Sequence, residues 1–288
     1  MKVAKIITTS FVERSIRMKT NLSGDPLGYF SHSQNFTTNE EILELIKFTL
    51  NLEVAINPGC SVDLIIINNK TGWDKGDIYL DSIKNKKINS GIVKILHREN
   101  IGRSFGGYNF AVDKFKDEYD FYIFTEDDIL INKENYASIA IEEFMKCKNC
   151  GFIAFQGLSM KFKNYSLENS IHAHGGVGLT SYSVLEKVIN KYGNLAYSSN
   201  LDHQDYESII EHGEVAFTNR IYKMGYKLTS ISRKIKLYEY AYDKIRNIKV
   251  PRYATKIDII IFYLKKHLIK FKIIKRLNDK YREKYKTN

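Results

Sequence analysis

The feature that most constrains the fold is the segment 121–129, in which a run of β-forming apolar residues ends in three consecutive carboxylates, Glu126, Asp127 and Asp128. A short apolar run of this kind predicts a buried strand. Ligands bind at the carboxyl ends of the strands in open α/β folds, so this strand would deliver its acids to a ligand-binding edge. Three adjacent carboxylates repel one another, and Mg²⁺ or Mn²⁺ carrying a phosphorylated substrate would suit their hard oxygens. The alternative is a solvated acidic turn without function.

Short apolar runs alternate with helical patterns along the rest of the chain, which predicts an α/β fold with a mostly parallel sheet flanked by helices. Further strands are expected at residues 3–9, 62–67, 92–96, 151–156 and 226–231. Helices are expected at residues 38–52, 78–84, 104–115, 133–146, 183–191 and 214–224. Thr37 and Thr38, each followed three residues later by Glu40 or Glu41, mark the start of the first helix as overlapping capping boxes.

Right-handed crossovers would bring the carboxyl ends of the first four strands to one edge of the sheet. We therefore expect a single ligand crevice at this edge. Besides the acidic triplet, its lining would come from Thr8, Thr9, Ser10, Asn68, Asn69, Asn100 and Gly102.

Three segments resemble, in this order, the motifs of the family-2 glycosyltransferases. Residues 98–109 resemble the N-x-G segment of that family, Phe124–Ile129 its DxD-type metal motif, and residues 214–226 its ED…R…G-[YW] segment. The resemblance covers residues 1–231 and implies a GT-A (Rossmann-like) catalytic domain. Its nucleotide-sugar half would span about 1–130 and its acceptor half about 131–231, followed by a basic, largely helical tail at 232–288. The implied reaction is metal-assisted, inverting transfer of a sugar from a nucleotide-diphospho-sugar to a hydroxyl.

The resemblance also implies site residues. Glu214 takes the position of the catalytic base, with Asp205 and Glu207 as rivals in the same acidic stretch. The alternative for Glu214 is a carboxylate that favours a helix N-terminus through the helix dipole. Asp128 and Glu126 are the expected ligands of Mn²⁺ or Mg²⁺.

His172 and His174 flank a glycine turn, and one of them, with His174 preferred, could reach the metal or the diphosphate. The alternative is that both histidines are structural or solvated. Arg103 could pair with phosphate, or it is a surface charge.

A UDP-sugar is the favoured donor. The residues expected to contact it are Thr8, Thr9, Ser10, Asn68, Asn69, Asn100, Gly102, Arg103, Glu126 and Asp127. Asn68 and Asn69 depart from the family, in which two aspartates usually end the second strand, so the nucleobase stays open. Gly106 and Gly107 would either approach the ligand or let the following helix pack tightly.

Positive charge is concentrated at the carboxyl-terminal end. The net charge is +11, yet residues 231–288 hold 18 Lys and Arg against 5 Asp and Glu, whereas the remainder holds 26 against 28. Residues 256–286 predict a basic amphipathic helix that lies on an anionic membrane. The acceptor would then be a glycan or lipid-linked molecule at the inner face of the membrane, as in surface polysaccharide, lipopolysaccharide or capsule synthesis. The alternative is a helix packed on the body or on a second subunit of a homo-oligomer.

Other classes are less consistent with the sequence. Nucleic-acid binding is not expected, because the body is not basic and no nucleic-acid motif is present. We see no signal peptide and no apolar run of about 18 residues, so we expect a cytoplasmic protein. Cys147 and Cys150 form a CxxC without a second pair, which favours a coincidence at a helix end over a zinc or redox site. The segment 21–39 has no counterpart in the family.

Two other functions stay open. A sugar nucleotidyltransferase of the same fold would need a glycine-rich, basic phosphate loop after the first strand, and residues 8–11 do not supply one. A non-catalytic, membrane-associated nucleotide-sugar-binding protein would fit the departure at Asn68 and Asn69. The acids retained at Glu126, Asp128 and Glu214 favour catalysis over that alternative.

Overall fold

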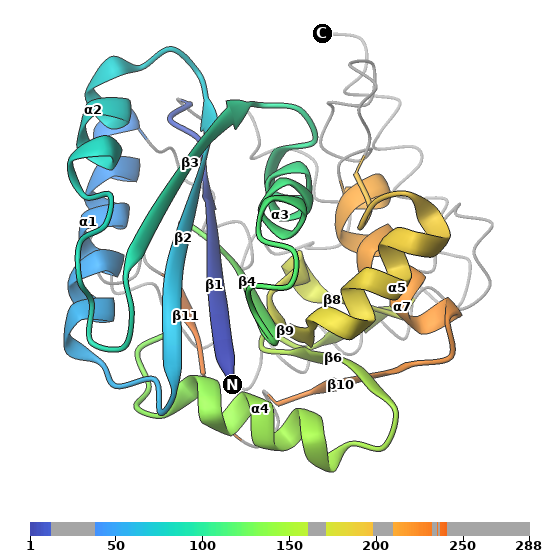
Figure 1. Ribbon diagram of the computed structural model, residues 1–288. Helices are drawn as coiled ribbons and strands as arrows, with labels where there is room; N and C mark the ends of the chain where they lie inside the picture. The colour runs from blue at the N-terminus through green and yellow to red at the C-terminus, as the bar shows by residue number, and fades with distance from the viewer. Residues whose placement is uncertain (13–37, 161–170, 198–209, 232–234, 236, 241–288) are drawn as a thin grey trace, which may run out of the picture.

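A seven-stranded sheet with helices on both faces forms the body of the protein (Figure 1). The computed structural model describes residues 1–12, 38–160, 171–197, 210–231, 235 and 237–240. The strand order is β10-β6-β9-β4-β1-β2-β3, and every strand is parallel to its neighbours except β9. The strands are β1 (Lys2–Thr9), β2 (Ser61–Lys70), β3 (Val93–Glu99), β4 (Phe121–Glu126), β6 (Cys150–Ala154), β9 (Gly178–Ser181) and β10 (Lys227–Ser230). The predicted α/β fold class, with a mostly parallel sheet flanked by helices, is confirmed.

Six α-helices lie in the described part of the chain. They are α1 (Asn39–Ala55), α2 (Asp74–Ser82), α3 (Arg103–Lys114), α4 (Tyr136–Lys146), α5 (Tyr182–Tyr192) and α7 (Ala216–Lys223). A π-helical segment, Ile210–Val215, leads into α7. Two small ribbons complete the fold: β5 (Ile129–Leu130) pairs with β11 (Glu239–Tyr240), and β7 (Leu158–Met160) pairs with β8 (Ile171–Ala173).

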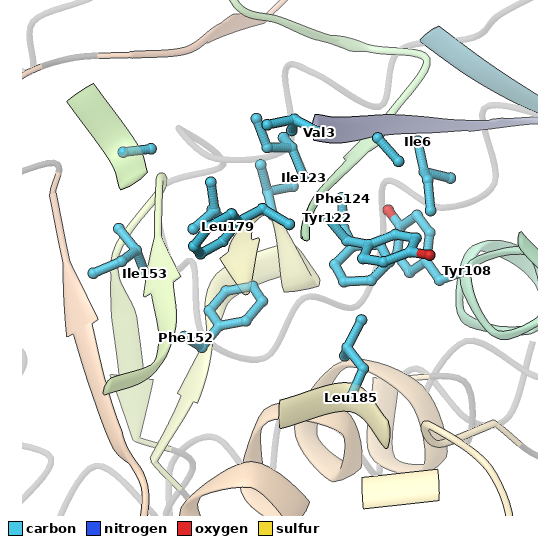
Figure 2. Close-up of a cluster of buried hydrophobic side chains, with 14 of the residues drawn as sticks. Val3, Ile6, Tyr108, Tyr122, Ile123, Phe124, Phe152, Ile153, Leu179 and Leu185 are labelled. Carbon is cyan, nitrogen blue, oxygen red and sulfur yellow. The ribbon is translucent and has the colours of Figure 1, made fainter. Parts of the chain in front are cut away.

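The sheet is buried on both faces because its central strands are apolar throughout. In β2, Leu64 and Ile66 pack in the cluster beneath α1 and α2, whereas Ile65 and Ile67 pack in the cluster that contains α3. This alternation follows from the two-residue period of a strand. Figure 1 shows α1 and α2 together on one side of the central strands and α3 on the other. The larger cluster continues beneath α5 and α7, and Figure 2 shows Tyr108, Tyr122, Phe124, Phe152, Leu179 and Leu185 within it.

The start of α1 is held by the capping box that the sequence predicts at Thr38. The Glu41 amide donates to Thr38 Oγ1 at 3.2 Å, and the Thr38 amide donates to Glu41 Oε2 at 3.0 Å. Thr37 and the segment 21–36 lie outside the described residues. Each box satisfies two amide groups that the first turn of a helix otherwise leaves without a partner.

Removing this cap should have a modest, measurable effect. We expect Thr38→Ala to lower the free energy of unfolding by about 1 kcal/mol, as measured by urea denaturation followed by circular dichroism. Ser82→Ala is the control, because the exposed Ser82 hydroxyl bonds, among the described residues, only the carbonyl of Tyr79 in the last turn of α2. Equal midpoints for the two variants would contradict the capping role.

The sequence analysis did not reveal β9. The sequence indicated only a glycine turn flanked by His172 and His174, whereas the chain enters the sheet at Gly178 and runs antiparallel between β4 and β6. A Cβ at Gly178 would lie 2.1 Å from the Ile153 carbonyl oxygen and 2.5 Å from the Phe152 ring. Glycine is therefore needed here for close approach between strands.

Two further differences concern the carboxyl-terminal part. The expectation that Glu214 begins an α-helix is wrong, because Glu214 lies in the π-helical segment and α7 begins at Ala216. Beyond residue 231 the chain returns to the body, where Leu237 is fully buried and β11 pairs with β5. The predicted helix at 256–286 lies outside the described residues.

Candidate functional site

The carboxyl ends of β1, β2, β3 and β4 meet at one edge, as predicted. The register places Thr8 beside Glu126 and Thr9 beside Asn68. It also places Asn68 beside His97, and Asn69 beside Arg98. Polar side chains from four strands thus adjoin at the edge where open α/β folds bind ligands.

The acidic triplet is held by hydroxyl groups from two elements. Glu126 accepts a hydrogen bond from Ser104 Oγ in the first turn of α3, at 2.5 Å. Asp127 is buried and accepts from Thr9 Oγ1 at 2.9 Å, and the partly buried Asp128 follows it. Tyr108 of α3 is fully buried nearby, and burial together with the Glu126 carboxylate raises the pKa of Tyr108 well above its usual value. The phenol therefore stays neutral and does not add to the negative charge.

The donor chemistry of the triplet fits a divalent cation. Carboxylate oxygens are the ligands that Mg²⁺ and Mn²⁺ prefer, and Mg²⁺ is usually held by one or two carboxylates together with substrate phosphates. Within the described ranges, no three His, Cys, Asp or Glu side chains are grouped as a metal site. The predicted set of Asp128, Glu126 and His174 stays a prediction, because the placement of the His174 side chain is not described.

Asn69 is fixed by an arginine. Arg98 donates from Nη1 to Asn69 Oδ1 at 2.5 Å and from Nη2 to the Ile101 carbonyl oxygen at 2.6 Å. Partial burial lowers the pKa of the Arg98 guanidinium from its usual value. These two bonds link the end of β2 to the turn before α3.

Asn68 belongs to a polar group that the sequence analysis missed. It is fully buried, its Nδ2 donates to Asp77 Oδ1 at 2.5 Å, and the same nitrogen lies 3.0 Å from His97 Nδ1. His97 Nε2 in turn lies 3.0 Å from Asp81 Oδ1. The sequence does contain a signal for this group, because Asn68 and His97 each directly follow an expected strand, 62–67 and 92–96. The β2–β3 register places the two residues side by side, and α2 supplies both aspartates.

Two amide oxygens at this edge point to a ligand. The buried Oδ1 atoms of Asn68 and Asn100 accept no hydrogen bond from any residue that the structure describes. Asn100 Nδ2 is used, because it donates to Ser10 Oγ at 3.3 Å. A buried acceptor left without a donor costs about 1–3 kcal/mol, so a ligand with N–H or O–H groups would be stabilised here.

The glycines of the N-x-G segment serve packing. Gly102 has a φ of 71°, and a Cβ there would lie 2.6 Å from the Tyr197 ring. A Cβ at Gly106 would lie 2.1 Å from the Ile101 carbonyl oxygen, and one at Gly107 would lie 2.7 Å from Thr8 Cγ2. The packing interpretation of Gly106 and Gly107 is therefore supported. Arg103, at the start of α3, is exposed.

Two other motif residues hold one segment in place. Asn109 Oδ1 accepts from the Leu195 amide at 2.9 Å. Arg220 Nη1 donates to the carbonyl oxygen of Asn194 at 2.8 Å and to its side-chain oxygen at 2.7 Å. The motif positions in α3 and α7 thus converge on the chain just after α5. This segment leads toward Asp205 and Glu207, which lie outside the described residues.

Glu214 is brought to the first turn of α3 by close packing. A Cβ at Gly213 would lie 2.5 Å from the Phe105 ring, and one at Gly176 would lie 2.7 Å from the same ring. Phe105 directly follows Ser104, which bonds Glu126. Glu214 Oε1 also lies 3.5 Å from Nε2 of His172, a side chain that is almost fully buried. The sequence analysis preferred His174 and gave His172 no role beside Glu214.

The structure also places the two cysteines of the CxxC motif. Cys147 is the C-cap residue of α4 and Cys150 begins β6, which is consistent with a coincidence at a helix end. No helix in the described residues is both long enough and apolar enough to cross a membrane.

Comparison with known proteins gives weak likenesses. No family model and no curated protein matches the chain. A crystal structure of S. aureus TarS is similar at 15% identity and a TM-score of 0.45, over 83% of this chain and 36% of TarS. A structure of TarS 1–349 gives the same identity and TM-score, and this chain covers 60% of it. CMP:2-keto-3-deoxy-manno-octonic acid synthetase complexed with CTP is similar at 9% identity and a TM-score of 0.42, over 80% of this chain and 89% of the synthetase.

Proposed function

We propose that the protein is a metal-assisted glycosyltransferase of the GT-A type. It would transfer a sugar from a nucleotide-diphospho-sugar, with a UDP-sugar favoured, to a hydroxyl of a glycan or lipid-linked acceptor with inversion. The observation that carries the proposal is the first turn of α3, which adjoins two separate acidic groups. Ser104 binds Glu126 of the triplet, and Phe105 packs on Gly213, the residue before Glu214.

The acidic triplet and Glu214 suit the two roles that such a displacement requires: stabilising the leaving group and accepting a proton from the nucleophile. A divalent cation held by Asp128 and Glu126 would neutralise the charge that builds on the leaving diphosphate. Glu214 would accept the proton of the attacking hydroxyl, as a carboxylate within hydrogen-bond reach can do. The nucleotide would bind at the sheet edge formed by Thr8, Asn68 and Asn100, and the buried amide oxygens would accept hydrogen bonds from its N–H or O–H groups.

The acceptor and the location rest on sequence alone. A basic helix at 256–286 would hold the protein on the inner face of an anionic membrane, next to a lipid-linked acceptor. A role in surface polysaccharide, lipopolysaccharide or capsule synthesis follows if that helix binds the membrane. The division into a nucleotide-sugar half and an acceptor half is part of the same proposal.

The test is ligand-dependent stabilisation followed by turnover. We expect Mn²⁺ with one nucleotide-diphospho-sugar to raise the melting temperature, because a ligand that binds the native state stabilises it. The shift should be lost in Asp128→Asn, along with release of the nucleoside diphosphate. Lys133→Gln, in the turn between β5 and α4, is a surface control that should keep both the melting-temperature shift and the release of nucleoside diphosphate.

Three outcomes would redirect the proposal. Release of pyrophosphate from a nucleoside triphosphate and a sugar phosphate would indicate a nucleotidyltransferase. Metal-dependent binding of a nucleotide-sugar without hydrolysis or transfer to any acceptor would indicate a binding protein. An Asp128→Asn variant with the wild-type metal response would remove the triplet from the mechanism.

A further inference from the structure

We propose that His172 is a positioning residue that orients the carboxylate of Glu214 toward the acceptor hydroxyl. The inference rests on the proposed function, because it takes Glu214 as the general base. It adds a residue that acts on the base and does not itself touch the sugar or the nucleotide.

The side chains of His172 and Glu214 are close together in the interior. His172 Nε2 lies 3.5 Å from Glu214 Oε1, and the side chains are 4% and 14% exposed. A buried imidazole nitrogen needs a polar partner, and a carboxylate is the strongest acceptor that a protein offers. The distance exceeds the 2.7–3.2 Å of an ordinary N–H···O bond by a few tenths of an ångström. Catalytic hydrogen bonds are often long in ligand-free structures and shorten when substrate binds.

His172 and Glu214 lie on elements that are bonded to each other. His172 lies in β8, where the ladder with β7 places it opposite Ser159. The next residue, Ala173, donates its amide hydrogen to Thr218 Oγ1 of α7 at 3.0 Å, and both groups are buried. Glu214 lies in the π-helical segment that continues directly into α7. The bond from β8 to α7 therefore sets the distance from the imidazole to the carboxylate.

Glu214 lies in a π-helical segment, Ile210–Val215. Single π-helical turns are rare, and those that occur are frequently found at functional sites. Here the segment carries Gly213 against the Phe105 ring and Glu214 beside His172. A regular α-helix has 3.6 residues per turn, fewer than a π-helix. A regular α-helical turn at this point would therefore change the direction of Glu214 relative to Phe105 and His172.

The chemistry explains what such a contact contributes. A hydrogen bond from His172 Nε2–H to Oε1 would hold the Glu214 carboxylate in one orientation toward the acceptor hydroxyl. As the acceptor oxygen forms its bond to the anomeric carbon, the acceptor proton moves to Glu214. The bond from that carbon to the diphosphate oxygen breaks, and its electron pair stays on the diphosphate. Restricting the carboxylate to one rotamer before the reaction increases the fraction of complexes that are ready to react.

The experiment is a kinetic double-mutant cycle. His172→Phe keeps the ring but removes the donor, and His172→Asn keeps an amide that is too short to reach. Both should lower kcat about 10- to 100-fold, the usual effect of removing an orienting partner. KM for the donor should stay within about twofold, because the nucleotide crevice is unchanged. His172→Gln, whose amide can supply the N–H, should recover most of kcat.

The decisive comparison is in the Glu214→Gln background. If His172 acts only through Glu214, His172→Phe should not lower the residual rate of Glu214→Gln further, because residues that act as a unit are not additive. Thr180→Val is the structural control. It removes the buried bond from Thr180 Oγ1 of β9 to the Gly151 carbonyl oxygen of β6, so it should lower the melting temperature while leaving kcat near that of the wild type.

The outcomes separate this inference from the proposed function. Wild-type kcat in folded His172→Phe and His172→Asn, with Glu214→Gln inactive, would overturn the role of His172 alone. If His172→Phe lowers kcat by the same factor in the wild type and in Glu214→Gln, His172 has a role independent of Glu214. That result would overturn the inference as well. Absence of transfer by the wild type would overturn the proposed function and, with it, this inference.

Discussion

Replacing Glu214 with glutamine is expected to lower kcat for sugar transfer roughly 100- to 10,000-fold, the usual contribution of a general base. The amide keeps the shape of the carboxylate but does not accept the proton of the acceptor hydroxyl. Glu214 is not among the residues expected to contact the nucleotide, so KM for the donor should stay within about twofold. Initial rates of nucleoside diphosphate release, at saturating donor and acceptor, measure the effect.

Glu211→Gln is the matched control for this variant. Glu211 lies in the same π-helical segment and is also partly buried. Its replacement removes one negative charge from the same segment and should leave kcat near the wild-type value. If the two variants turn over equally fast, the base is another residue. Asp205 and Glu207, the rivals from the sequence, would then be the next to replace.

The second large effect is on stability, at a buried ion pair beneath α1. Lys5 in the middle of β1 is fully buried and pairs with Glu53 in the last turn of α1, which is 4% exposed. Glu53 Oε2 also accepts from the Tyr136 hydroxyl of α4 at 3.0 Å, and Lys5 Nζ lies 5.0 Å from the centre of the Tyr136 ring. These three side chains join β1, α1 and α4 in the interior.

We expect Glu53→Gln to lower the free energy of unfolding by about 3–5 kcal/mol, because it leaves the Lys5 ammonium buried without its counter-charge. A typical domain is stable by only about 5–15 kcal/mol, so the variant should unfold at a much lower urea concentration. Chemical denaturation followed by tryptophan fluorescence and circular dichroism measures the change.

Glu44→Gln is the matched control for Glu53→Gln, since Glu44 pairs with Lys47 on the exposed face of the same helix at 2.7 Å. An exposed pair of this kind contributes about 0–1 kcal/mol, so this control should be nearly neutral. Lys5→Met combined with Glu53→Gln removes both charges and should be more stable than Glu53→Gln alone. Equal stability of Glu53→Gln and Glu44→Gln would show that the Lys5–Glu53 pair does not support the fold.

The local parts of the fold could be predicted from sequence because their signals are local. The capping box at Thr38 and Glu41 placed the start of α1, and the apolar run before Glu126 placed β4. The meeting of four strand ends followed from the handedness of crossovers and did not require contacts between particular side chains. The candidate nucleotide edge was therefore within reach of sequence reasoning.

The rest depends on partners far apart in the chain. Lys5 appears in the sequence as one polar residue in an apolar strand, and nothing near it indicates Glu53, 48 residues later. His172 and Glu214 are likewise 42 positions apart and meet only because β8 is bonded to α7. The segment around Gly178 resembled a loop, because glycine serves both flexible turns and tight strand contacts.

The position of β9 has a consequence for the order in which the protein can be made. β4 and β6 are both synthesised before β9, yet β9 lies between them and pairs with each. On the ribosome, one edge of β4 would thus stay without its partner until Ser181 has emerged from the exit tunnel. An open strand edge can pair with other chains, and a nascent chain with late non-local contacts is exposed to aggregation. A stalled or truncated product that ends between α4 and β9 would therefore be a substrate for chaperones, however intact its nucleotide edge.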